Sequence, residues 1–137
     1  MELPESKAKR LIKLCGSNDP LIIASQRGII ISYEDLGKVW GYFHYFNRVP
    51  LIHINNNLDE FGSRFTLAHE IGHYMLHPNI NTPYLKANTL FSIDRIEREA
   101  NQFALNLLIG SRIPEYNETM KSFLLRCEIP EDYHSFY

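Results

Sequence analysis

Apolar residues recur every three or four positions in two long stretches of the chain, which is the pattern of amphipathic helices. In the first stretch, from about Leu58 to Leu76, Leu67, Ile71 and Met75 fall four residues apart. The second stretch runs from about Ile93 to Leu108, and its apolar stripe consists of Ile96, Ala100, Phe103, Ala104 and Leu107. We expect both stretches to be helices that bury these stripes in the core.

Residues near the ends of these stretches predict where the helices begin and end. Asn57, with Glu60 three residues later, resembles an N-terminal capping box for the first helix, and Pro78 stops it. Gly110 suits the C-terminal cap of the second helix. Shorter helices are predicted at residues 5–15, 21–26 and 118–127, and a loop at residues 79–89.

Short runs rich in β-branched and aromatic residues predict strands at 29–33, 39–46 and 51–54. Asn47-Arg48 turns the second run into the third as a hairpin. Pro50 at the start of the third run favours an edge strand, where a missing N–H costs little, and such an edge would pair with an extended peptide. The order of elements predicts an α+β fold in which a short antiparallel sheet packs on the two long helices.

Composition narrows the class of protein further. The 137 residues predict one domain, 1–137, and 45% hydrophobic with 22% charged residues is ordinary for a globular protein. A net charge of -2 gives no electrostatic reason for binding nucleic acid or an anionic membrane. Two distant cysteines, and a charged start without the apolar stretch of a signal peptide, favour a soluble cytoplasmic protein.

The segment from His69 to His73 reads His-Glu-x-x-His within the first predicted helix. Residues four apart on a helix lie one turn above each other on one face, so both imidazoles can bind the same Zn²⁺ ion. Glu70 is rotated about 100° away and stands beside the metal, where a general base takes a proton from the attacking water. Gly72 is expected to leave room near the metal. The alternative interpretation makes both histidines surface residues satisfied by their neighbours.

A catalytic zinc site usually has a third protein ligand, and the second predicted helix offers candidates. Glu97 and Asn101 are four residues apart and share a face, which suggests that Glu97 binds the metal while Asn101 holds an imidazole N–H. Glu99 points elsewhere on the helix and is the competing ligand. Glu97 and Glu99 could also belong to a solvated charged face without any ligand.

The four other histidines are weaker candidates. His77 continues the column of His69 and His73, but a helix drifts about 40° for every four residues. We therefore expect His77 to line the pocket or to support the metal ligands rather than to bind the metal. His44 and His53 lie on predicted strands and are expected to be structural, and His134 lies in the tail.

Two motifs together resemble the signature of the ImmA/IrrE family of metallopeptidases. The first is Arg-Phe-Thr-Leu-Ala-His-Glu-Ile-Gly-His-Tyr-Met-Leu-His at 64–77, and the second is Glu-Arg-Glu-Ala-Asn-Gln-Phe-Ala-Leu-Asn-Leu-Leu at 97–108. The strands upstream also fit, so the resemblance covers most of residues 19–115. It implies a small zincin-like α+β domain.

The resemblance also implies a site and a function. His69, His73 and Glu97 would be the metal ligands, Zn²⁺ the cofactor and Glu70 the catalytic base. Members of the family cut, or help to cut, Xre-type helix-turn-helix repressors of phages and mobile elements. We therefore expect a zinc endopeptidase whose protein substrate is such a repressor. The alternative from another class is a non-catalytic zinc-containing module that captures a repressor; a nucleic-acid binder is a more distant third, because no basic stripe is present.

Overall fold

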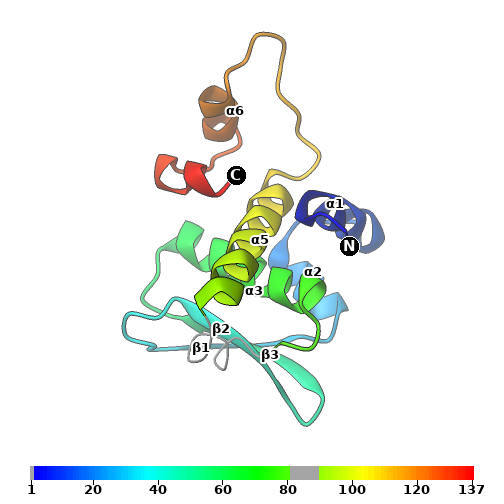
Figure 1. Cartoon of the computed structure of the whole chain (residues 1–137), viewed down its shortest axis with the longest axis vertical. Helices are drawn as coiled ribbons and strands as arrows, with labels where there is room; N and C mark the ends of the chain where they lie inside the picture. Colours follow the sequence, from blue (N-terminus) through cyan, green and yellow to red (C-terminus); the bar gives the residue numbers. More distant parts are fainter. Residues whose placement is uncertain (1, 81–89) are drawn as a thin grey trace.

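Helix α3 (Glu60–Leu76) lies at the centre of the fold, between a three-stranded sheet and helix α5 (Leu90–Ile109) (Figure 1). The computed structural model describes residues 2–80 and 90–137, so the predicted loop at 79–89 lies almost wholly outside the described residues. Helix α1 (Pro4–Cys15) packs mainly on α5, and α2 (Pro20–Gln26) packs on α3. The predicted α+β class is confirmed.

The sheet consists of β1 (Ile30–Glu34), β2 (Gly41–Phe46) and β3 (Val49–Asn55) in the spatial order β1-β3-β2. Strands β2 and β3 form the predicted antiparallel hairpin. Strand β1, however, pairs with β3 in parallel, so the sheet is mixed rather than wholly antiparallel. Strand β2 runs opposite to β3, and β3 runs in the same direction as β1.

Strand β3 is the central strand, so the expected edge position of Pro50 is wrong. Pairing with β1 begins only at Leu51, and the missing N–H of Pro50 therefore removes no bond to β1. On the other side, Pro50 faces Tyr45. Phe46 and Val49 close the two-residue turn as a hydrogen-bonded pair, and hydrogen-bonded and non-hydrogen-bonded pairs alternate along an antiparallel ladder. The Tyr45–Pro50 pair is therefore a non-hydrogen-bonded one, and it needs no N–H from Pro50. Because β3 has partners on both sides, the expected addition of a peptide to this strand is also wrong.

The hairpin turn has the backbone that the sequence predicts. Asn47 and Arg48 have φ values of 50° and 67°, which is the left-handed conformation that a two-residue turn of type I′ requires at both positions. This turn matches the twist of the strands that it joins and fixes their register. It thereby sets Phe43 opposite Ile52, and both side chains are fully buried against the helices.

Helix α3 begins two residues later than predicted because a different residue caps it. The carboxylate of Asp59 accepts a hydrogen bond from the backbone N–H of Gly62 at 2.7 Å. Asn57, the predicted cap, instead donates its backbone N–H to the side chain of Asn55 at 3.0 Å. At the other long helix, Gly110 adopts φ 71° directly after Ile109 and provides the predicted C-terminal cap.

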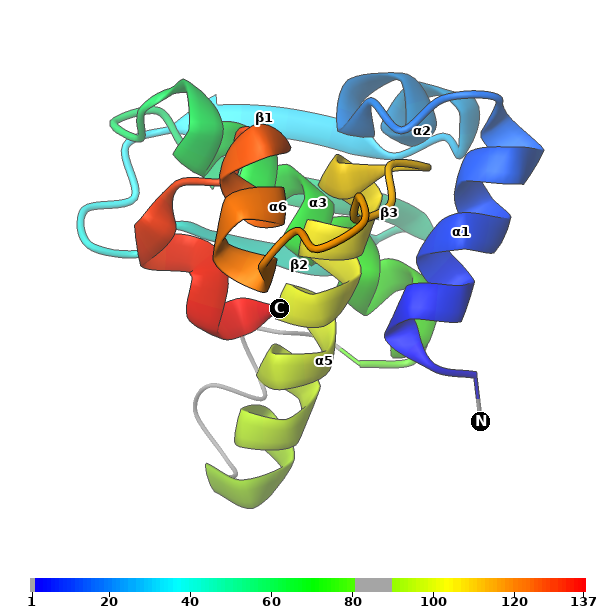
Figure 2. The same ribbon diagram turned by 90° about the horizontal axis from the view of Figure 1, so that it is seen from above.

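The apolar stripes of the two long helices face each other and the sheet. Leu67 and Ile71 of α3 are buried, as is every member of the predicted α5 stripe: Ile96, Ala100, Phe103, Ala104 and Leu107. Helix α6 (Met120–Arg126) and the 3-10 helix η1 (Glu131–Phe136) complete the described chain, and η1 returns to lie against α5 (Figure 2). No helix in the described ranges is long and apolar enough to cross a bilayer.

Gly72 serves the contact between the two long helices, and the expectation that it makes room near the metal is wrong. A Cβ atom at this position would lie 3.0 Å from Cδ1 and 3.3 Å from Cβ of Phe103. Phe103 is fully buried on α5. The absence of a side chain at Gly72 therefore lets α5 approach α3 closely at the level of the metal-binding motif.

Replacing Gly72 with Ala is expected to lower the free energy of unfolding by up to about 2 kcal/mol, because overpacking against the buried Phe103 exceeds the roughly 1 kcal/mol that Ala gains over Gly inside a helix. Urea unfolding followed by circular dichroism measures the change. Phe103→Leu in the same chain should recover part of the loss, and Phe103→Leu alone is the matched control. An unfolding free energy equal to that of wild type would contradict this account of Gly72.

Candidate metal centre

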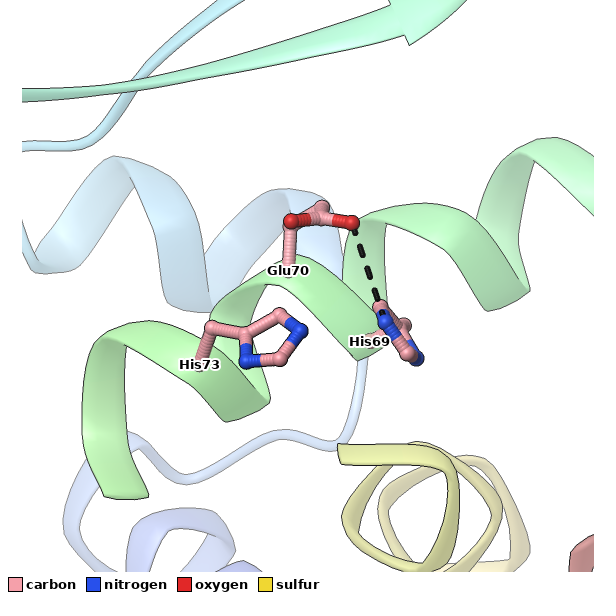
Figure 3. Close-up of side chains that lie close together, drawn as sticks. All are labelled: His69, Glu70 and His73. Atoms are coloured by element: carbon pink, nitrogen blue, oxygen red, sulfur yellow. Dashed lines mark ion pairs between the residues drawn. The ribbon is translucent and has the colours of Figure 1, made fainter. Parts of the chain in front are cut away.

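Helix α3 presents His69 and His73 one turn apart on its inner face, with Glu70 beside them (Figure 3). One ligand atom from each of the three side chains can be chosen so that all lie within 4.8 Å of one another. The exposed fractions are 8% for His69, 3% for Glu70 and 0% for His73. Burying three polar side chains so close together costs free energy unless hydrogen-bond partners or an ion compensate them.

Helix α5 brings the carboxylate of Glu97 to both imidazoles. Its Oε2 atom lies 3.1 Å from Nε2 of His69, and its Oε1 atom lies 2.8 Å from Nε2 of His73. Glu99, the competing candidate, instead contacts Nε2 of His77 at 2.9 Å. The fold thus separates the two carboxylates that helix spacing left as alternatives: Glu97 meets the pair of histidines, and Glu99 lies behind them.

The other ring nitrogen of each histidine also has a partner. Nδ1 of His69 lies 2.8 Å from Oδ1 of Asn101, which is the contact that the spacing of Glu97 and Asn101 predicts. Nδ1 of His73 lies 3.1 Å from Nδ1 of His77. Since His77 in turn meets Glu99, a row of side chains from both helices orients His73, and His77 lies behind the motif as expected.

The protons available to this network are too few for its contacts. Three neutral imidazoles supply three N–H groups, whereas five contacts join them to one another, to Asn101 and to the two carboxylates. When Asn101 accepts, two of the five contacts are therefore left without a proton. A divalent cation held by His69, His73 and Glu97 would replace the two contacts of Glu97, and the three N–H groups would then serve the three contacts that remain. The donor set of two imidazoles and one carboxylate therefore fits a divalent metal, and it is a set that zinc accepts.

The pKa shifts of His73 and Glu97 favour the forms that bind a metal, a neutral imidazole and a carboxylate, whereas the shift of His69 favours its protonated form while no ion is bound. Burial lowers the pKa of His73 to about 4, so its imidazole is neutral at pH 7 and offers a lone pair. Burial alone would lower the pKa of His69 too, but the hydrogen bond to Glu97 and the nearby carboxylates outweigh it and raise that pKa. Burial opposes ionisation of Glu97, yet the two imidazoles hold its pKa well below the usual range.

Glu70 lies to one side of the three converging groups. Its Oε2 atom is 3.8 Å from Nε2 of His69, the pair joined by the dashed line in Figure 3. Both contacts of Glu97 with the histidines are shorter. The Glu70 side chain also borders a cleft of about 350 Å³ that reaches His69, Glu97 and Asn101. Glu70 thus lies beside the candidate metal ligands and lines the same space that a substrate can enter, where a general base is needed.

The cleft contains residues that the sequence analysis did not single out. They come from the segment that leads into β2 and from the end of the described chain, and they are Lys38, Val39, Trp40, Gly41 and Phe136. Trp40 and Phe136 are 96 residues apart, so no local pattern predicts that they share a wall. His44 and His53 lie away from the cleft, on the sheet. Nε2 of His44 is 2.8 Å from Nε2 of His53, and Nδ1 of His53 contacts Glu34.

Replacing Asn101 with Ala is expected to weaken zinc binding by about 10- to 100-fold, because Nδ1 of His69 loses the acceptor that orients its ring. Competition with a chromophoric chelator measures the affinity. Asn101→Asp keeps an acceptor oxygen and should retain most of it. Asn106→Ala is a matched control on the same helix, since Asn106 bonds the carbonyl of Gln102. Equal affinities for Asn101→Ala and Asn106→Ala would contradict the orienting role.

Comparison with known proteins agrees with this geometry. Residues 24–134 match the model of the IrrE N-terminal-like domain, a peptidase family. The chain is 40% identical over 108 residues to immunity region protein 2 of Bacillus phage phi105, which covers 78% of this chain and 68% of that protein. It is 33% identical over 109 residues to metallopeptidase ImmA of Bacillus subtilis (strain 168), covering 78% of this chain and 63% of that protein.

The matched region contains every residue of the candidate metal centre, from the motif on α3 to Glu97 and Asn101 on α5. The resemblance noted in the two sequence motifs is therefore confirmed over most of the chain. A divalent metal is implied by the family, and the buried cluster of histidines and glutamates provides for one. The chain belongs to the ImmA/IrrE family of metallopeptidases, which is built on the IrrE N-terminal-like domain.

Proposed function

We propose that this chain is a zinc-dependent endopeptidase that hydrolyses a peptide bond in a protein substrate. The observation that carries the proposal is the convergence of two imidazole Nε2 atoms and the Glu97 carboxylate, with Glu70 beside them at the edge of a cleft. A purely structural zinc site is usually closed by four protein ligands. Here three candidate ligands adjoin an accessible space, which is the arrangement of a catalytic site.

Each residue of the centre has a role in this proposal. His69, His73 and Glu97 hold the ion, which when bound supplies a Lewis acid that lowers the pKa of water and polarises a carbonyl. Glu70 accepts the proton of the attacking water and then gives it to the leaving amine. Asn101 and His77 fix the ring orientations of His69 and His73 through their Nδ1 atoms.

We further propose that the substrate is a helix-turn-helix repressor of a phage or mobile element. The support comes from the two relatives: one is named for a phage immunity region, and the other as a metallopeptidase. The stretch that this chain shares with them spans about two thirds of each relative. The net charge of -2 gives the chain no general attraction to DNA, which favours action on the repressor protein itself.

Incubation of the zinc-loaded protein with the repressor encoded beside its gene tests this function. We expect cleavage at a defined bond, identified by mass spectrometry of the intact fragments. A zinc chelator should stop the reaction, and added Zn²⁺ should restore it. The His69→Ala protein, which lacks a metal ligand, is the control. An intact repressor after incubation with the zinc-loaded protein would refute the choice of substrate.

A further inference from the structure

We propose that the cleft beside the metal centre selects peptides that carry a large apolar side chain next to the scissile bond. This inference rests on the proposed peptidase function and names the class of substrate that the same site takes. Trp40 and Phe136 are the residues to which we assign the selection. Both line the cleft that also reaches His69, Glu70 and Glu97, so a side chain held there belongs to a residue close to the reacting carbonyl.

The lining of the cleft combines the polar groups of the candidate centre with apolar side chains. The polar side chains are those of Lys38, Thr66, His69, Glu70, Glu97 and Asn101, and Gly41 contributes backbone. The apolar side chains are those of Val39, Trp40, Phe65 and Phe136. A peptide whose carbonyl reaches His69 and Glu70 in this cleft can therefore place an adjacent side chain against aromatic and aliphatic surface.

Much of that apolar surface is open to solvent. The exposed fractions are 45% for Val39 and 46% for Trp40, and Phe136 is half-buried. Covering these apolar side chains with a large apolar side chain of the ligand removes both from water, which makes the free energy of binding more favourable. Offset or edge-on contacts between aromatic rings add to this effect. A small or polar side chain in the same place would leave these surfaces hydrated. The cleft is thus built to distinguish side chains by apolar bulk.

An aromatic cluster holds the outer wall in place. The Tyr133 ring lies 4.6 Å from the centroid of Phe61 and 4.9 Å from that of Phe65. Phe136 stacks on Phe65 with centroids 5.6 Å apart and planes 20° apart. Phe65 in turn lies 6.1 Å from the ring of His69. Helix η1, seen beside α5 in Figure 2, therefore presents Phe136 at a fixed position relative to the metal-bearing helix.

Binding can be measured without catalysis because Trp40 is the only tryptophan of the chain. The zinc-loaded Glu70→Gln protein is titrated with amino-acid hydroxamates that differ only in the side chain: phenylalanine, leucine, alanine and serine. We expect the phenylalanine and leucine probes to shift the Trp40 emission to shorter wavelength and to bind at least about 10-fold more tightly than the alanine probe. Equal affinities of the four probes, in protein shown to contain zinc, would overturn the inference.

Two variants change the size of the cleft in opposite directions. Phe136→Ala should reduce the preference for phenylalanine over alanine to less than about 3-fold, with zinc content unchanged. Val39→Phe narrows the cleft and should favour the alanine probe. Phe46→Ala is the matched control, since Phe46 is 63% exposed on β2 and does not line the cleft. A preference that neither cleft variant alters would overturn the assignment of these walls.

Digestion of a mixed peptide library separates this inference from the proposed function. The wild-type protein should produce new termini with phenylalanine, leucine or methionine enriched on one side of the cut, and Phe136→Ala should flatten that enrichment. Cleavage without a side-chain preference would sustain the peptidase and overturn the selection. If no peptide is cut but the hydroxamate preference persists, the cleft assignment holds and the peptidase function fails.

Discussion

Replacing Glu70 with Gln is expected to lower kcat for peptide hydrolysis by about 10²- to 10⁴-fold, the usual contribution of a general acid–base group. The amide keeps the shape of the side chain but cannot accept the proton of the attacking water. Zinc content should stay at the wild-type level, because Glu70 lies 3.8 Å from Nε2 of His69 while Glu97 makes the shorter contacts to both histidines. Fragment formation and metal content are measured on the same preparations.

The same variant separates the enzyme from the alternative of a binding module. A protein that acts by capturing a repressor would keep its biological effect after Glu70→Gln, whereas a peptidase would lose it. Glu60→Gln is a suitable control, since Glu60 lies in the first turn of the same helix and outside the cleft. Undiminished cleavage by Glu70→Gln would remove Glu70 from the role of base.

Replacing Glu97 with Ala is expected to reduce zinc affinity by more than about 100-fold, whereas Glu99→Ala should cost about 10- to 100-fold. The difference follows from their positions. Glu97 faces the Nε2 atoms of His69 and His73, and Glu99 acts only through His77. Loss of a metal ligand is expected to exceed the loss of an orienting partner, which is typically within two orders of magnitude.

Mass spectrometry of metal content and chelator competition measure both variants, with circular dichroism to show that each is folded. Glu97→Gln is a useful companion because it keeps the volume and removes the charge. Zinc retained by Glu97→Ala and lost by Glu99→Ala would reverse the assignment. Equal retention by both would mean that neither carboxylate is a ligand.

Much of the fold could be predicted because its elements depend on local patterns. The apolar stripes of α3 and α5 follow the helical period. The turn at Asn47-Arg48 is predicted because these two residues separate two strand-like runs, which is the spacing of a two-residue hairpin. The sequence predicts the cap of α3 at Asn57, because Glu60 three residues later resembles a capping box. Asp59 is an equally good cap and takes this position, while Asn57 bonds to Asn55 instead. Strand β3 is central because β1, which precedes the hairpin in the chain, pairs with its free edge. No local sequence signal encodes this pairing between distant segments.

The candidate centre divides in the same way. The spacing of His69 and His73 on one helix, and of Glu97 and Asn101 on another, predicts two half-sites, and the structure brings them together. The wall of the cleft could not be predicted, because Phe136 reaches it only through aromatic packing of a C-terminal turn that shows no periodic pattern. Sequence thus identifies the candidate reactive groups more readily than the surfaces around them.

The candidate ligands come from two different helices, so the ion would act as a cross-link between α3 and α5. Such an ion binds the folded chain and has no preformed site in the unfolded one. Stability would then depend on the free concentration of the metal, rising by about 2.7 kcal/mol when that concentration is 100 times the Kd. A cell that withholds the metal would therefore shorten the lifetime of this protein, and its abundance would follow metal supply.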